Sequence, residues 1–320
     1  MGGWMCALES VGIEMKAVVT GATGFVGGWI VEELLSQGDE VTVVVRNASR
    51  VPKHWEDKVR IIESSLEQLK NVQSNDFNEE KADIFFHMAW AGTAGLERAD
   101  VGLQLANVEY TCDAVRLAAR LGCSRFVNAG SIMEYEAKEY IVQNGSNPGM
   151  SYIYSSAKLT ADCMAKVVAI NEKIEYINAI ISNIYGVGEK SARFLNTTIR
   201  KMLTNKDIPL TLGDQMYDFI YAEDAAKAIV IAGKKGEKNN SYYIGNEVQR
   251  PLKEYIKDMH RILNSGSKLG FGEVEFRGAK LDYSILDVTK MRQLGFVPKI
   301  SFEEGIIRTR DWIVEVENEY

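Results

Sequence analysis

The chain has 320 residues, of which 46% are hydrophobic and 25% are charged, a composition that is typical of a folded globular protein and excludes extensive disorder. A net charge of −7 argues against the basic surface that nucleic-acid binding requires. Because the sequence has neither a run of about 18 apolar residues nor a signal peptide at residues 1–14, we expect a cytoplasmic protein that does not bind a membrane.

Four cysteines and three histidines are scattered along the chain without the close spacing of a metal site. We therefore expect no metal. The length suits a larger domain with a smaller part attached to it.

From residue 15 onward, apolar runs alternate with segments of helical periodicity, which predicts an α/β fold with a doubly wound parallel sheet. In the first two helical segments, apolar residues recur every three or four positions, as at Val26, Ile30 and Leu34. The predicted buried strands are residues 16–20, 41–45, 83–89, 125–130 and 176–181.

The segment TGATGFVG, residues 20–27, joins the first strand to the first helix. Gly21 permits a tight turn, Gly24 lets the backbone approach a pyrophosphate, and Gly27 lets the helix pack closely on the sheet. Because the turn also opens a helix whose N-terminus attracts anions, it predicts dinucleotide binding by a Rossmann domain. The predicted cofactor residues of the turn are Gly21, Thr23, Gly24, Phe25, Val26 and Gly27.

The end of the second strand usually decides between NAD and NADP, because an acidic residue there holds the adenosine ribose. Here the chain reads VTVVVRNASR, which places Arg46 at that position and Arg50 soon after it. Guanidinium groups pair with the phosphate of NADP, so we expect NADP to be preferred, with NAD as the alternative.

Tyr154 and Lys158 lie four residues apart on one face of a predicted helix. An ammonium group near a phenol stabilises phenolate and makes tyrosine a proton donor and acceptor near neutral pH. Ser131 follows the strand at residues 125–130, and its hydroxyl is able to polarise a carbonyl. Trp90, after the strand at residues 83–89, is expected either to shape a ligand pocket at the carboxyl end of the sheet or to pack in the core.

After about residue 186 the alternation gives way to a mixed region, with helices near 193–204 and 252–263 and short strands at 208–212 and 273–277. The helix that begins at Glu223 and the strand after it are expected to return to the main sheet. We predict a dinucleotide-binding domain at residues 15–186 plus about 213–245. The smaller mixed α/β substrate-binding domain is predicted at about 187–212 and 246–320.

Several of these motifs occur together in the order of one known family. The chain resembles the extended short-chain dehydrogenase/reductase family, in its branch of NAD(P)-dependent nucleotide-sugar epimerases, dehydratases and 4-ketoreductases. The resemblance covers nearly everything after Met15. It is carried by TGATGFVG (20–27), HMA (87–89), NVEYT (107–111), Ser131, YSSAK (154–158) and NIYG (183–186).

The resemblance implies that Tyr154 is the general acid/base and that Ser131 hydrogen-bonds the sugar oxygen. Lys158 would hold the nicotinamide ribose and lower the pKa of the tyrosine. On the substrate side, Asn183 would contact the sugar nucleotide and Arg277 would clamp its diphosphate, with Trp90 shaping the sugar pocket. The other residues assigned to the cofactor side are Ser65, Leu66, Ala89 and Asn107.

The chain departs from the family pattern at several positions. The dehydratases carry an acidic pair directly after the catalytic hydroxyl residue, where this chain has Ile132 and Met133, so dehydration is disfavoured. Glu134 is acidic, but it lies one position after the place of that pair. Two arginines of the family are replaced, by Tyr217 and Ile180, which weakens the prediction of the substrate.

These observations favour an enzyme that uses NADPH to reduce the keto group of a nucleotide-linked 4-keto-6-deoxy sugar, because Arg46 favours NADPH. The alternatives are an NAD-dependent nucleotide-sugar 4-epimerase and a non-catalytic protein that senses NADP. The resemblance also suggests a homodimer, formed through the helices around residues 103–121 and 152–170.

Overall fold

The computed structural model describes residues 14–78, 80–142, 149–276 and 281–318. Its centre is a seven-stranded sheet in which neighbouring strands are parallel, in the order β11-β6-β5-β4-β1-β2-β3. The predicted doubly wound Rossmann sheet is therefore confirmed. The strands are β1 (Lys16–Thr20), β2 (Glu40–Val45), β3 (Val59–Glu63), β4 (Ile84–His87), β5 (Arg125–Ser131), β6 (Glu175–Ile181) and β11 (Asn240–Ile244).

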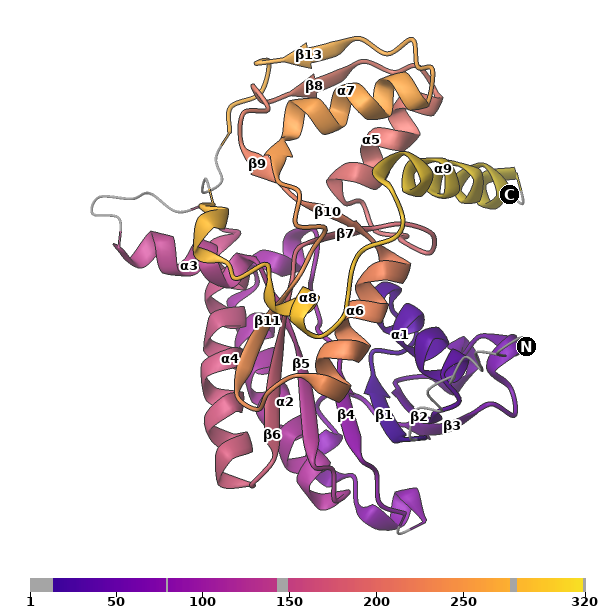
Figure 1. The fold of residues 1–320 in the computed structure, drawn as a ribbon, viewed down its shortest axis with the longest axis vertical. Helices are drawn as coiled ribbons and strands as arrows, with labels where there is room; N and C mark the ends of the chain where they lie inside the picture. The colour runs from indigo at the N-terminus through magenta and orange to yellow at the C-terminus, as the bar shows by residue number, and fades with distance from the viewer. Residues whose placement is uncertain (1–13, 79, 143–148, 277–280, 319–320) are drawn as a thin grey trace, which may run out of the picture.

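Helices cover both faces of this sheet (Figure 1), which is why valine, isoleucine and phenylalanine fill its central strands. On one face, α1 (Phe25–Ser36) packs against α6 (Ala222–Lys235), and both share an apolar core with β1, β2 and β4. On the other face, α2 (Val101–Arg120) lies beside α4 (Tyr152–Asn171), and small side chains of both helices pack onto the sheet.

The direction of winding reverses between β4 and β1. From β1 the chain continues outward through β2 and β3, whereas from β4 it continues the other way through β5 and β6. The connections that leave the carboxyl ends of β1 and β4 therefore diverge, and open α/β sheets bind ligands in the crevice between such connections. The glycine turn follows β1 and Trp90 follows β4, so both border this crevice.

A smaller part of the molecule lies at one end of the sheet (Figure 1) and has an apolar core of its own. Three two-stranded pairs contribute to it, β7 with β10, β8 with β13 and β9 with β12. Its elements are β7 (Asn183–Tyr185), α5 (Phe194–Leu203), β8 (Ile208–Leu210), β9 (Met216–Tyr217), β10 (Phe219–Tyr221), β12 (Arg250–Pro251), α7 (Leu252–Ile262), β13 (Leu269–Phe271) and α9 (Phe302–Asn318). The predicted domain boundaries themselves stay a prediction.

The remaining elements are short. Two are the helices α3 (Met133–Val142) and α8 (Lys290–Gln293). The others are 3-10 turns: η1 (Ala48–Arg50), η2 (Lys53–Trp55), η3 (Leu69–Asn71), η4 (Ser74–Phe77), η5 (Leu96–Ala99) and η6 (Tyr283–Ile285). Within the described part of the chain, no helix has the length and apolarity needed to cross a membrane.

The prediction of a strand at residues 273–277 is wrong over the described residues 273–276, because the observed strand in this region ends at Phe271. The structure has β13 instead, which pairs in parallel with β8. Gly272 has a φ of +86°, and the backbone N–H groups of Gly272 and Val274 both donate to the carbonyl oxygen of Leu210. This turn ends the ladder before the predicted segment begins.

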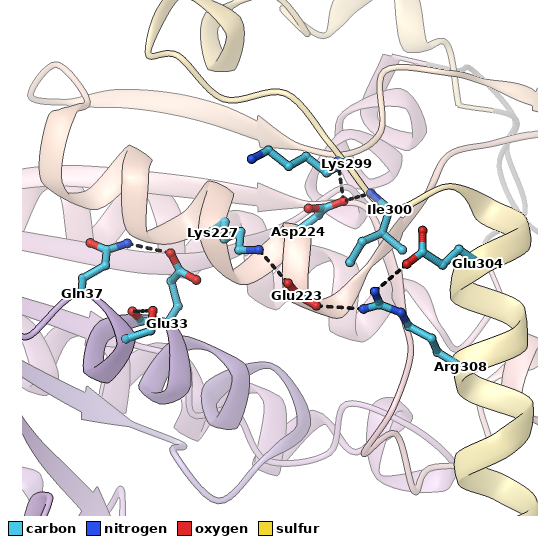
Figure 2. A network of polar contacts seen from close by, with 10 residues as sticks. Glu33, Gln37, Glu223, Asp224, Lys227, Lys299, Ile300, Glu304 and Arg308 are labelled. Atoms are coloured by element: carbon cyan, nitrogen blue, oxygen red, sulfur yellow. Dashed lines mark hydrogen bonds and ion pairs between the residues drawn. The ribbon is translucent and has the colours of Figure 1, made fainter. Parts of the chain in front are cut away.

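Polar contacts fasten the last segment of the chain to α6 (Figure 2). The carboxylate of Asp224, which is 1% exposed, accepts hydrogen bonds from the backbone N–H groups of Lys299 at 2.8 Å and Ile300 at 2.7 Å. The neighbouring Glu223 pairs with Arg308 of α9 at 3.0 Å. These contacts join a helix that covers the sheet to a helix of the smaller part.

Candidate active site

The glycine-rich turn between β1 and α1 has a conformation that requires glycine at two positions. Gly21 has a φ of +70°, and a Cβ atom there would lie 2.7 Å from the backbone nitrogen of Ala89. A Cβ atom on Gly27 would lie 2.1 Å from the carbonyl oxygen of Gly21. Gly24 caps α1 without a side chain, so the first N–H groups of the helix are not occupied by a capping side chain. Such a turn is suited to hold a pyrophosphate.

A cavity of about 400 Å³ lies between this turn and the carboxyl ends of β2 and β3. Arg46 and Arg50, which follow β2, are exposed and line it. The cavity has the position that an adenosine ribose takes in such folds, and the two arginines are able to pair with a phosphate on that ribose. The other predicted cofactor residues in its wall are Ser65, Leu66 and Ala89.

A second cavity, of about 980 Å³, lies between the glycine turn and residues 187–193. Trp90 borders both cavities, which are therefore neighbours in one crevice. Trp29 of α1 donates a hydrogen bond from Nε1 to the carbonyl oxygen of Val187 at 3.0 Å and holds that loop in place. The turn, the open helix end and the two cavities together fit a dinucleotide. The predicted turn residues in the second cavity are Gly21, Thr23, Gly24, Phe25, Val26 and Gly27.

The three predicted catalytic side chains meet at the carboxyl end of β5. Ser131 is the last residue of β5, whereas Tyr154 and Lys158 lie one turn apart in α4. None of the three is more than 8% exposed. Nζ of Lys158 donates to the carbonyl oxygen of Ala129 at 2.9 Å, and the Ser131 side chain is near enough to Tyr154 to lower its pKa.

Burial opposes ionisation at this site. It raises the pKa of Tyr154 and lowers the pKa of Lys158. For Tyr154, the positive charge of Arg98, the hydrogen bond with Ser131 and the charge of Arg193 all lower the pKa, with Arg98 the largest of the three. The phenol is therefore a proton donor whose ionised form depends on its neighbours.

Trp90 lies against both predicted catalytic residues of α4. Its ring centroid is 6.0 Å from that of Tyr154 in an edge-to-face arrangement, and Nζ of Lys158 lies 3.6 Å from the Trp90 centroid. The amide of Asn107 makes two hydrogen bonds of 2.9 Å with the backbone of Ala91. The structure thus places Trp90 beside the phenol of Tyr154, while Asn107 supports the loop that carries Trp90.

Two further substrate residues were predicted. Asn183 begins β7, where its Nδ2 donates to the carbonyl oxygen of Asp218 at 3.2 Å. Like Ser131, Tyr154 and Lys158, Asn183 is not part of the walls of the two cavities. Arg277 lies outside the described residues. Their contacts with a substrate stay predictions.

Glu134 holds the end of β5 through hydrogen bonds. It is 1% exposed, and its carboxyl oxygens accept hydrogen bonds from the backbone N–H of Ser131 at 2.8 Å and from Nδ2 of Asn178 at 3.2 Å. Burial raises the pKa of Glu134. The two residues between Ser131 and Glu134 are apolar, and Ile132 is buried in an apolar cluster. Neither is able to transfer a proton.

The sequence reasoning missed Arg98, Gln104 and Arg193. Arg98 belongs to η5, and its Cζ lies 4.3 Å from the ring centroid of Tyr154. Arg193 lines the larger cavity, and Gln104 is fully buried under the loop after β4. In the segment AGTAGLERAD nothing distinguishes Arg98 from a surface arginine, because it is the fold that brings it to the phenol.

The glycine-rich turn and the parallel sheet together define an α/β fold of the dinucleotide-binding kind. The model of the NAD dependent epimerase/dehydratase family matches residues 17–245. The chain therefore belongs to that family, and it is an enzyme of the oxidoreductase or epimerase class. The resemblance to extended short-chain dehydrogenases/reductases is confirmed.

Relatives of known function cover nearly the whole chain. The CDP-abequose synthase of Salmonella muenchen is 24% identical over 298 residues, which are 92% of this chain and 96% of the relative. Two solved structures share the fold. The UDP-glucose 4-epimerase of Thermotoga maritima, solved with UDP-glucose, has a TM-score of 0.79 at 20% identity and covers 95% of this chain and 100% of its own. The UDP-glucose 4-epimerase of Thermus thermophilus, solved with NAD, has a TM-score of 0.74 at 19% identity, with 94% and 99% coverage.

Proposed function

We propose that the enzyme reduces the keto group of a nucleotide-linked 4-keto-6-deoxy sugar at the expense of NADPH. The observation that carries this proposal is the pair of arginines, Arg46 and Arg50, in the wall of the smaller cavity. In a strand-end position where an acid would repel a 2′-phosphate, these cations favour one. NADPH is the form that reductive enzymes consume, whereas an epimerase returns the hydride that it takes.

The described side chains support the proton-transfer half of this reaction. Tyr154 donates its proton to the keto oxygen as that oxygen gains negative charge, and Ser131 hydrogen-bonds the same oxygen. Lys158 holds the ribose next to the nicotinamide. When bound, the nicotinamide supplies the hydride to the keto carbon, so that one hydride and one proton convert the ketone to an alcohol.

The proposed partner is a nucleotide-diphosphate sugar. The names of the relatives support this class, since a CDP sugar appears in one and UDP-glucose in the others. We assign Asn183 and Arg277 to the nucleotide side of the substrate, with Trp90 and Ser131 at the sugar. The apolar Ile132 and Met133 favour reduction over loss of water, because a dehydratase needs a proton-transferring side chain at that point.

Nucleotide binding tests this proposal. We expect the purified protein to bind NADPH more tightly than NADH in fluorescence titrations, and to consume NADPH when given a CDP-, UDP- or dTDP-4-keto-6-deoxyglucose. Arg46→Asp should reverse the preference, with an Arg116→Asp variant on the outer part of α2 as the charge-matched control. Tightly held NAD in the purified protein, with no preference for NADPH, would instead indicate the 4-epimerase. Binding of NADP without turnover of any sugar would indicate a sensor.

A further inference from the structure

The loop that follows β4 is held by a buried amide from α2. Gln104 is fully buried, and its Nε2 donates to the carbonyl oxygens of Gly92 at 2.9 Å and Glu97 at 3.1 Å. Its Oε1 accepts a hydrogen bond from Nε1 of Trp90 at 2.9 Å. Gly92 has a φ of +70°, and a Cβ atom there would lie 2.8 Å from the side chain of Leu103. The position of η5 is therefore fixed by packing and hydrogen bonds.

This fixed turn places Arg98 on the face of the Tyr154 ring. The guanidinium carbon lies 4.3 Å from the ring centroid, within the range of a cation–π interaction. The Nε atom of Arg98 is buried and has no hydrogen-bond partner among the described residues. A buried donor without a partner is costly, and such groups in folded proteins call for an explanation.

Lys158, the neighbour expected to assist the phenol, lies farther from the Tyr154 ring than Arg98 does. Its Nζ is 6.0 Å from the Tyr154 centroid but 3.6 Å from the Trp90 centroid, and it donates to the carbonyl oxygen of Ala129. Arginine also keeps its charge at every pH that a protein tolerates, which a buried lysine does not.

We propose that Arg98 is a positioning residue for Tyr154, and that its permanent charge on the ring face stabilises the phenolate through which the tyrosine transfers its proton. The inference rests on the proposed role of Tyr154 in the reaction. It adds a loop arginine to the electrostatic part that the family resemblance gives to Lys158.

Other charges also reach Tyr154, and they set the size of the expected effect. Arg193, before α5, lowers the pKa of Tyr154 less than Arg98 does, whereas Glu134 of α3 raises it. Lys158 lies on the same helix as the phenol. Removal of Arg98 therefore leaves one nearby arginine in place, so we expect a partial loss of phenolate stability.

The test measures the ionisation of Tyr154 directly. A fluorinated tyrosine is incorporated at position 154, because fluorine acidifies the phenol and brings its titration into a range that the folded protein tolerates. The single ¹⁹F NMR signal is then followed against pH in the full chain. Since no substrate is present, the result does not depend on whether the proposed reaction is the correct one.

We expect Arg98→Met to raise the midpoint of this titration by about one pH unit, which is about a tenfold lower ionisation constant. Arg98→Lys, which keeps the charge, should recover at least half of that shift. Arg116→Met is the matched control, because Arg116 pairs with Asp113 on α2 at 2.8 Å, and it should leave the midpoint unchanged. Arg98→Gln gives a second neutral side chain in case Arg98→Met fails to fold.

An unchanged midpoint in a folded neutral variant would overturn the proposal. So would an equal shift in Arg98→Lys and Arg98→Met, because the effect would then come from packing and not from charge. If the titration shifts as expected but no keto sugar is reduced, the role of Arg98 stands and the proposed reaction falls.

Discussion

Single side chains at the end of β5 carry the proposed chemistry, and Tyr154 can be tested by removal of one oxygen atom. Tyr154→Phe keeps the ring that packs against Trp90 but removes the proton that the keto oxygen receives. We expect kcat to fall by about 10² to 10⁴, with NADPH affinity and thermal stability close to those of the parent. Steady-state kinetics and a nucleotide titration measure both. Retained turnover would exclude Tyr154 as the acid.

His87, at the end of β4, gives the protein a pH-dependent stability. It is 2% exposed, Nδ1 lies 2.9 Å from Oγ1 of Thr20, and burial lowers its pKa to about 3. The unfolded chain takes up this proton below about pH 6.5, whereas the folded protein does not. This contribution is therefore complete above pH 6.5 and is lost as the pH falls toward 3.

His87→Gln removes that proton-binding difference. Between pH 7.5 and 4.5 the parent should lose about 2 to 3 kcal/mol more free energy of unfolding than the variant. Urea unfolding at the two pH values measures the change, and any pH-independent cost of the substitution cancels. Equal losses in the two proteins would mean that the imidazole is protonated in the folded state.

The spacing of Tyr154 and Lys158 was sufficient to predict that they share one face of a helix. The glycine turn was likewise predictable from its spacing, because its close contacts exclude a side chain. The place of Ser131 beside Tyr154 and Lys158 was implied by the family resemblance, because 23 residues of chain between Ser131 and Tyr154 fix no distance. Arg98 could not be found in either way. Its distance from the phenol is set by the path of a loop, and no periodic pattern reports that path.

At the scale of elements, one carboxylate fixes how the end of the chain meets α6. Asp224→Ala leaves two backbone donors, those of Lys299 and Ile300, without their acceptor (Figure 2). We expect a loss of about 2 to 4 kcal/mol in the free energy of unfolding, because buried donors without partners are costly.

The adjacent Glu223 offers a matched comparison. Its carboxylate is 30% exposed and pairs with Arg308 at 3.0 Å, and ion pairs of this kind contribute about 0 to 1 kcal/mol. Glu223→Ala should therefore shift the urea midpoint much less than Asp224→Ala does. Similar shifts in the two variants would mean that the backbone contacts of Asp224 contribute no more to stability than an exposed ion pair.

Most strands of the sheet were predictable because they are continuous apolar runs bounded by turns. In the smaller part, the predicted helices near 193–204 and 252–263 correspond to α5 and α7, whereas most of the strands were not predicted. Its strands have two or three residues, too few for a pattern to appear. The predicted strand at 273–277 is an example. Its apolar and polar residues alternate as in a strand, but the chain makes a turn there after β13. Long-range pairing such as that of β8 with β13 has no local signal.

At the scale of the whole molecule, α2 and α4 each expose apolar side chains. The exposed fraction is 59% for Leu105 of α2 and 59% for Val167 of α4, and the other members are Val101, Met164 and Ile170. Contiguous apolar patches mark contacts between proteins, and these side chains lie on the helices predicted to form a homodimer.

We expect a homodimer of this 35.8-kDa chain, with twice that mass by light scattering after size-exclusion chromatography. Val167→Asp should give a monomer, because a charge cannot be buried there without a partner. Val314→Asp, on α9 at 44% exposure, is the control and should leave the mass unchanged. A monomeric parent, or a dimer that tolerates Val167→Asp, would place the contact elsewhere or remove it.

The core of the smaller part has a consequence for how the protein is made. Its side chains come from residues as far apart as Tyr185 and Ile313, whereas six of the seven sheet strands have been translated by Ile181. A nascent chain can therefore pair most strands of its sheet before α9, which completes the core of the smaller part, has been translated. A polypeptide that stopped before Lys299 would expose apolar surface and leave Asp224 unbonded. Premature termination at almost any point should thus yield a target for proteolytic quality control rather than a shortened enzyme.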